Sequence, residues 1–521
     1  MRLSTSIMDF PPRHDPRKPP AEPTSMAGGR GAFLLAVFAS AAGAGLLALT
    51  NGSPVVIPAL CVGVALLVVF VQRLEFGIYI LLGTALLVEQ YQIFGIHDIV
   101  TAKIPFYLNL NLITGVKPLV FNPVELVLGL MVGCWFLRAT ISREWSLVRV
   151  PNLGVAALFL VMLIVFTAYG LARGGDWKVS LWEIRALYYL CGSYLITTQI
   201  IRTRRQVQIC VWIVIVMTAI KGCQGCWRYV VTLHGNLTGI RAIVGHEDAL
   251  FITTVFLLGL SFLLLRYRGK ELWLIALSLP MTFATYIWAQ RRITFGTLGI
   301  SILIMVAMLP AERRRNAIKS MAPFALLFMV YLAAFWNVER GGIAMPAQKI
   351  KSVFVEKKGT EDESSNFYRK AELVNLRQTL HDHPLGIGFG NKYEIIMPLD
   401  RIDFPLWEYI PHNCIYWMWV KTGFIGFTIF WLFFGVAIIQ AVVDYRAMRD
   451  AYFKSLAMMA LLFIVSQVIV AYYDLQIVFF RNMLYLGIVM ALAVSVRRIE
   501  AEEQAAGAGK AVGRLGNQAV T

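Results

Sequence analysis

The chain has 521 residues, of which 58% are hydrophobic and only 15% carry a charge, and its formal net charge is +17. A soluble domain carries about 25% charged residues, so the composition excludes one soluble core and predicts an all-α polytopic membrane protein. The positive residues occur in short clusters between apolar runs. That pattern is typical of membrane topology signals and argues against nucleic acid as a partner.

Apolar runs follow one another along most of the chain. Each is close to the length of about 20 residues that an α-helix needs to cross a bilayer, and together they predict about 14 transmembrane helices. The polar, Pro-rich segment 1–30 and the Ala- and Gly-rich segment 497–521 are expected to be disordered cytoplasmic tails. The runs lie near residues 31–50, 54–72, 76–94, 122–139, 151–171, 180–201, 207–230, 248–266, 272–290, 293–310, 320–337, 412–440, 455–473 and 475–496.

The connecting segments alternate between rich and poor in Lys and Arg. Positive residues are concentrated in cytoplasmic loops, so we predict eleven helices over 31–337, three over 412–496, and both termini in the cytoplasm. The segment 338–411 then forms one long periplasmic loop, and loops of such length are usually functional. Residues 365–383 of this loop are expected to form an amphipathic helix that ends before Pro384 and a Gly-rich turn.

Two arginines, Arg291 and Arg292, lie where two predicted helices meet at the outer face. Cations are disfavoured in a short outer loop, and a guanidinium binds phosphate oxygens in a bidentate manner. The pair therefore predicts an anionic ligand; the alternative is an interfacial pair that contacts lipid phosphates.

The long loop offers two further candidates. His412 follows Pro411 where the loop enters the membrane, and a neutral imidazole there can accept a proton from a sugar hydroxyl; alternatively it only caps a helix. Arg369 opens the amphipathic helix and is either a ligand contact or a solvated charge. His381 and His383 are two positions apart and do not share a helix face, so no metal site is predicted.

Several predicted membrane helices contain cations, which are expensive in a bilayer and are functional candidates by default. Their excess over acidic residues suggests a cavity that attracts anions. Asp474 and Arg481 are seven positions apart, about two helical turns, and would therefore share a face. The cations are Arg185, Lys221, Arg228, Lys421 and Arg481, and the possible partners are Glu183, Asp248 and Asp474.

Three stretches, in this order, resemble the superfamily of O-antigen ligases and O-antigen polymerases. They are Gln290-Arg291-Arg292-Ile293-Thr294, the segment from Tyr368 to Gly390, and His412-Asn413 followed by Lys421-Thr422-Gly423. The family pattern has a small residue where Arg291 stands and an acidic residue where Lys421 stands. Both Arg291 and Arg292 therefore remain candidates for the working arginine.

This resemblance implies an architecture like that of C-type glycosyltransferases and a glycosyl transfer without metal or cofactor. The reaction would take place at the periplasmic face of a bacterial inner membrane, among its lipids. The donor would be a glycan on undecaprenyl pyrophosphate, and the acceptor a lipid A-core sugar for a ligase or a lipid-linked glycan for a polymerase. The implied roles are catalysis by His412 and Arg369, pyrophosphate binding by Arg291, Arg292 and Arg369, and support by Asn413, Lys421 and Arg481.

Two other functions fit parts of the sequence. A transporter or flippase of lipid-linked or anionic solutes would also have many helices and buried cations, but its path does not need the long loop with its Arg, His and Gly-rich turn. A scaffold for envelope assembly would leave the intramembrane cations unexplained.

Overall fold

The chain folds as a bundle of helices in the computed structural model, which describes residues 44–45, 56–93, 96, 99–115, 117, 119–142, 148, 150–237, 240, 242–338, 343–355, 361–402 and 404–518. These residues contain no strand, as the all-α prediction requires. The predicted tail 1–30 lies outside the described residues, as does the run 31–50 apart from residues 44–45.

The described apolar runs form helices at the predicted places. Among the described residues, eight helices are long and apolar enough to cross a membrane, and α2, α3, α9 and α11 are shorter apolar helices. A helical membrane protein is thereby confirmed, whereas the number of crossings remains a prediction. The bundle consists of α2 (Val56–Gln72), α3 (Glu75–Leu87), α5 (Pro123–Ser142), α6 (Leu153–Ala172), α7 (Trp177–Ile200), α8 (Arg204–Trp227), α9 (Asp248–Leu264), α10 (Lys270–Trp288), α11 (Arg292–Met308), α12 (Ala311–Phe335), α15 (Cys414–Ala447), α16 (Ala451–Ala471) and α17 (Phe480–Gln518).

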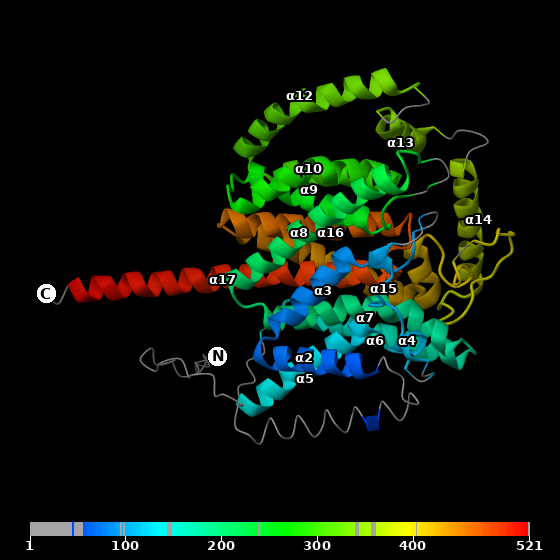
Figure 1. The fold of residues 1–521 in the computed structure, drawn as a ribbon, viewed down its shortest axis with the longest axis horizontal. Helices are drawn as coiled ribbons and strands as arrows, with labels where there is room; N and C mark the ends of the chain where they lie inside the picture. The colour runs from blue at the N-terminus through cyan, green and yellow to red at the C-terminus, as the bar shows by residue number, and fades with distance from the viewer. Residues whose placement is uncertain are drawn as a thin grey trace, which may run out of the picture.

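The helices run side by side, and α17 lies at the centre of the bundle (Figure 1). It packs against α7, α3 and α16, while α8 packs against α10 and α3. In its most apolar stretch 89% of the α17 residues are buried, compared with 0% for α12, which contacts mainly α11 and α13. The bilayer is therefore the expected neighbour of α12.

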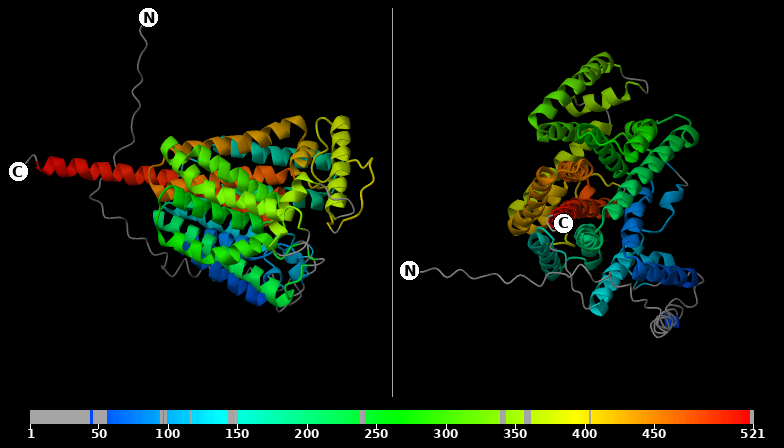
Figure 2. Two further views of the ribbon diagram at one scale, coloured as in Figure 1. Left: turned by 90° about the horizontal axis from the view of Figure 1, so that it is seen from above. Right: turned by 90° about the vertical axis from the view of Figure 1, so that its left-hand side faces the viewer.

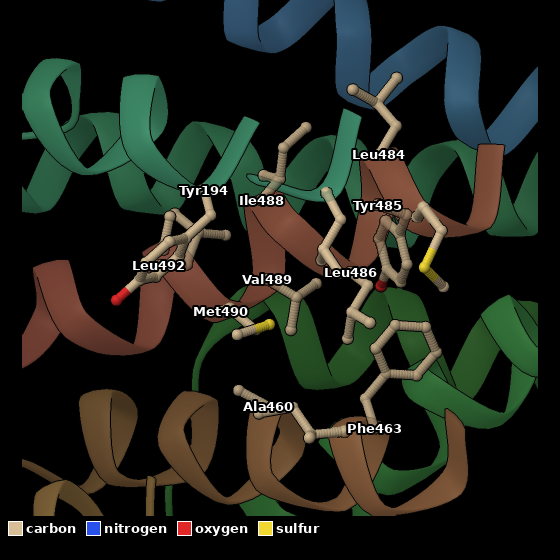
Figure 3. Packing of buried hydrophobic residues seen from close by; sticks show 14 of the residues in the cluster. Tyr194, Ala460, Phe463, Leu484, Tyr485, Leu486, Ile488, Val489, Met490 and Leu492 are labelled. Carbon is tan, nitrogen blue, oxygen red and sulfur yellow. The ribbon is translucent and has the colours of Figure 1, made fainter. Parts of the chain in front are cut away.

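Interdigitated apolar side chains fill the space around α17 (Figure 3). Leu486 and Val489 of α17 lie towards Ala460 and Phe463 of α16, and Tyr485 meets Phe463 edge-on at 5.0 Å between ring centroids. In a membrane such close packing holds helices together, because lipid is as apolar as the side chains themselves.

The long loop between α12 and α15 contains two described helices, α13 (Met345–Phe354) and α14 (Glu361–Asp382). The amphipathic helix predicted over 365–383 is therefore present and begins one turn earlier. Its expected apolar face packs inward, with Leu376 fully buried against Ile387. Figure 2 shows α14 across one end of the bundle and the C-terminal part of α17 projecting from the other.

The Gly-rich turn after α14 inserts between two membrane helices. Gly388 has φ +77°, and a Cβ atom on it would lie 2.3 Å from the Cα atom of Gly170 in α6. Only glycine fits this conformation and this approach. Gly423, with φ +58°, interrupts the helical backbone of α15 opposite Leu385, so the turn and the break in the helix fit each other.

Two predicted boundaries near the C-terminus are wrong. The run 475–496 is not one helix, because the short 3-10 helix η3 (Gln476–Val478) precedes α17; Asp474 and Arg481 therefore do not share a helix face. The expected disordered tail from Arg497 instead continues α17 to Gln518. The Ala, Glu and Gln residues of this segment favour helix, and Arg498 and Glu502 form an ion pair at i and i+4.

Candidate functional site

A cavity of about 1650 Å³ lies at the end of the bundle that α14 crosses. The helices α7, α9, α11, α15 and α17 begin at this end, and helix N-termini contribute partial positive charge. Basic side chains on the walls outnumber the acidic ones. The charged and imidazole groups that line the cavity are Glu89, Lys178, His246, Glu247, Arg291, Arg292, Lys349, Arg369, Asp400, His412, Asp474 and Arg481.

Most of the residues selected from the sequence meet at this cavity, although they come from four separate segments. Arg291, Arg292, Arg369, His412 and Arg481 all line it. The other two do not. Asn413 caps α15, because its side chain accepts hydrogen bonds from the Ile415 and Tyr416 amides, and Lys421 is buried elsewhere.

A carboxylate that the sequence analysis missed holds His412. Glu372 of α14 is 2% exposed; its Oε2 accepts a hydrogen bond from the His412 backbone amide at 2.9 Å, and its Oε1 lies 3.2 Å from His412 Nδ1. A carboxylate only accepts, so in the neutral imidazole this contact favours the tautomer with the proton on Nδ1 and the lone pair on Nε2. Tyr368 packs edge-on against the imidazole at 5.5 Å. The ring is therefore fixed in its tautomer and orientation.

This geometry also decides one alternative for His412. The capping side chain of α15 belongs to Asn413, so His412 is not the cap of that helix. One signal in the sequence points to Glu372. It lies three positions after Arg369 and four after Tyr368, and residues at these spacings share a helix face.

The arginine pair lies at a sharp junction between α10 and α11. Gln290 adopts φ 56° there, a conformation that is uncommon for residues other than glycine. Its side-chain amide donates to the carbonyl of Ile240 at 3.2 Å. Arg292 donates to the Ser352 carbonyl of α13 at 3.4 Å, so this arginine joins the membrane hairpin to the long loop. Both arginines line the cavity.

The intramembrane cations have more acidic partners than expected, and each of them pairs with a carboxylate. Lys221 and Arg228 both pair with Glu89, at 2.9 and 2.7 Å, and Arg481 pairs with Asp248 at 2.6 Å. We call these five residues the buried ion cluster. Arg185 pairs with Glu125.

A second imidazole and carboxylate lie on the wall near Arg291. His246 Nδ1 is 3.4 Å from Asp474 Oδ2, and Gln476 and the Leu475 amide also donate to this carboxylate. Burial raises the pKa of Asp474, but His246 and Arg291 outweigh it and hold the pKa well below its usual range. Asp474 is therefore a fixed negative group, and its predicted partner Arg481 binds Asp248 instead.

Lys421 anchors the Gly-rich turn. It is fully buried and pairs with the equally buried Glu183 of α7 at 2.7 Å. Lys421 also donates to the Asn391 carbonyl, and Glu183 accepts from the Gly390 amide and the Trp417 indole. This pair holds α7, α15 and the turn together, so its position supports the fold of the loop without lining the cavity.

Replacing one member of this pair is expected to destabilise the protein severely. Lys421→Met leaves the Glu183 carboxylate buried without its cation, which costs about 3–5 kcal/mol. Thermal unfolding in detergent should show a large fall in Tm. The double variant Glu183→Gln/Lys421→Met removes both charges and should recover most of the loss. A single variant as stable as the native chain would contradict the anchoring role.

The fold and the cavity together define a multi-helix membrane protein with a large, cation-rich cavity at one end of its bundle. In the part of the chain that the structure describes, no group of three or more His, Cys, Asp or Glu residues is arranged to hold a metal ion. No protein-family model matches the chain, and comparison with curated proteins finds no similar sequence.

Proposed function

We propose that the chain is a membrane glycosyltransferase that moves a glycan from undecaprenyl pyrophosphate to a sugar hydroxyl at the periplasmic face of a bacterial inner membrane. The observation that carries the proposal is the meeting of the His412–Glu372 dyad with Arg291, Arg292 and Arg369 in one cavity. Such a transfer needs a base and a group that binds the pyrophosphate. We call Arg291, Arg292 and Arg369 together the arginine clamp.

The chemistry assigns one step to each part. The bond between the anomeric carbon and the pyrophosphate oxygen breaks with oxocarbenium character, and the electron pair leaves with the pyrophosphate. Fixed guanidinium groups stabilise the charge that develops there. The acceptor oxygen bonds to the anomeric carbon and gives its proton to His412 Nε2, and Glu372 stabilises the resulting imidazolium.

The function is tested with purified protein in liposomes, using the lipid-linked glycan of a strain that carries the gene. Transfer to a lipid A-core acceptor identifies a ligase, and growth of the lipid-linked chain identifies a polymerase. In a deletion strain, single repeat units on the carrier indicate a polymerase and long unattached chains indicate a ligase. The absence of both products, with normal glycans in the deletion strain, would refute the proposal.

The buried ion cluster favours a second candidate, a transporter of lipid-linked or anionic solutes. Intramembrane ion pairs commonly mark transport pathways, and Glu89 and Arg481 reach the cavity. The same liposomes separate the two functions, because a flippase moves the lipid-linked glycan across the bilayer and forms no new glycosidic bond.

The proposal places the cavity outside the cytoplasm, with both termini inside. In a background without native cysteines, Val374→Cys on the exposed face of α14 should react with an impermeant thiol reagent in intact cells. Arg449→Cys, in the connection between α15 and α16, should react only after the membrane is broken. The reverse pattern would overturn the orientation and with it the periplasmic site.

A further inference from the structure

A row of aromatic rings lines one wall of the cavity. Phe404 and Trp182 have ring centroids 5.9 Å apart, and Trp182 lies 5.5 Å from Phe480. The neighbouring Phe479 lies 6.0 Å from Tyr91. Four of these side chains, Tyr91, Trp182, Phe404 and Phe479, line the cavity itself; we call them the aromatic strip.

The strip is held rigidly and has polar groups beside it. Gln90 donates to the Tyr91 hydroxyl at 2.9 Å and accepts from the Phe480 amide at 2.8 Å. The His246 ring lies 6.0 Å from Phe479, and His246 pairs with Asp474. Both Gln90 and Asp474 also line the cavity. Apolar ring faces thus alternate with hydrogen-bonding side chains along one wall.

Membrane proteins also carry aromatic residues for reasons unrelated to ligands, since Trp and Tyr gather at the membrane interface. Trp177 and Trp273 are of that kind: they are 49% and 78% exposed and do not line the cavity. Tyr91 is 45% exposed, but towards the cavity, where charged groups accompany it. The strip therefore faces a cavity that charged groups also line.

The size of the cavity indicates a ligand with more than an anionic group. Its volume of about 1650 Å³ exceeds the roughly 300–1,000 Å³ of a small-molecule pocket. The arginine clamp would bind the anionic group and forms only one part of the cavity lining. A pyranose ring has apolar C–H faces that stack on aromatic rings, and hydroxyl groups on its rim that donate to carboxylates and amides.

We propose that the aromatic strip, with Gln90 and Asp474 beside it, is a subsite for a pyranose ring of a substrate glycan. The inference rests on the proposed function for the identity of that glycan. The ring belongs to the donor glycan or to the acceptor, and kinetics distinguish the two. The strip positions the sugar, while the arginine clamp and the His412–Glu372 dyad act on the reacting atoms.

The test uses the full-length protein and four variants: Trp182→Ala, Tyr91→Ala, the conservative Trp182→Phe and the control Trp177→Ala. Trp177 is on the same helix as Trp182 but outside the cavity. The probe is the strain's own oligosaccharide, released from its lipid by mild acid, and its binding is measured by ligand-observed NMR. We expect Trp182→Ala and Tyr91→Ala each to weaken binding about tenfold, Trp182→Phe to recover most of it, and Trp177→Ala to bind normally.

Transfer kinetics then assign the ring and separate the two proposals. A rise in KM for the donor alone places the donor glycan on the strip, and a rise for the acceptor alone places the acceptor there. Oligosaccharide binding that depends on Trp182 in a protein without transfer activity would support the subsite and refute the transferase. Equal binding by the Trp182, Tyr91 and Trp177 variants would overturn the subsite, whatever their activity. Because Tyr91 is 45% exposed, Tyr91→Ala is expected to fold normally. It therefore keeps the comparison valid if Trp182→Ala folds poorly.

Discussion

His412→Ala is expected to lower the rate of glycan transfer by about a hundred- to ten-thousand-fold, the usual contribution of a general base. The imidazole combines an acceptor nitrogen with a fixed orientation, since Glu372 binds both its ring and its backbone amide. Arg291 and Arg292 cannot replace it, because guanidinium stays protonated. Transfer is measured with purified protein, and donor binding is measured separately and should persist.

Three further variants serve as controls for the His412→Ala result. His412→Gln keeps a polar side chain without a base and should be nearly as slow as His412→Ala. Glu372→Gln removes the charge that fixes the tautomer and should lower kcat with little change in donor binding. Asn413→Ala removes the helix cap, costs about 1 kcal/mol of stability and should leave turnover near normal. Wild-type transfer by both His412 variants would remove this residue from the mechanism.

The double variant Arg291→Ala/Arg292→Ala is expected to lose most donor binding and at least about a hundred- to a thousand-fold in kcat, as loss of a single transition-state charge contact does. Both guanidinium groups line the cavity. Each arginine is then tested alone, and the position that matters should be rescued only in part by lysine, since a point charge lacks the bidentate fork.

Arg377→Ala is the matched control for the clamp. Arg377 is an exposed arginine on α14 that does not line the cavity, so its loss removes a positive charge near the site without touching the ligand. Normal donor binding and transfer are expected. If the double variant behaves like this control at equal expression, the clamp assignment fails and the cations serve only topology or packing.

The sequence alone predicts where most of the helices lie, but not where they begin and end. Long apolar runs predict helices because a bilayer leaves backbone groups no other partner. The break at Gly423 and the turn before α17 depend on contacts with Leu385 and with the buried neighbours of Asp474. The hydropathy of the sequence does not reveal these contacts between distant residues. The Ala- and Gly-rich composition of the segment after Arg497 predicts disorder, so the helix there is not evident from the sequence.

The same limit applies to the site. Arg291 and His412 were selected from their positions at predicted membrane boundaries, and Arg369 from the start of the predicted amphipathic helix; the structure brings them to one cavity. Glu372 and the aromatic strip were missed, since their importance comes from side chains more than thirty positions away in the sequence. The acidic partners of the buried cations were missed for a related reason: Glu89 and Glu125 lie at helix ends, where the sequence does not show which cation they meet.

The dyad joins two segments that are forty positions apart: Glu372 belongs to α14, and His412 precedes α15. Leu376 of α14 packs in one buried cluster with Val420 of α15, so the seat of α14 on the bundle sets the place of the carboxylate. A substitution that loosens this seat would change the orientation of the proposed base without altering either member of the dyad.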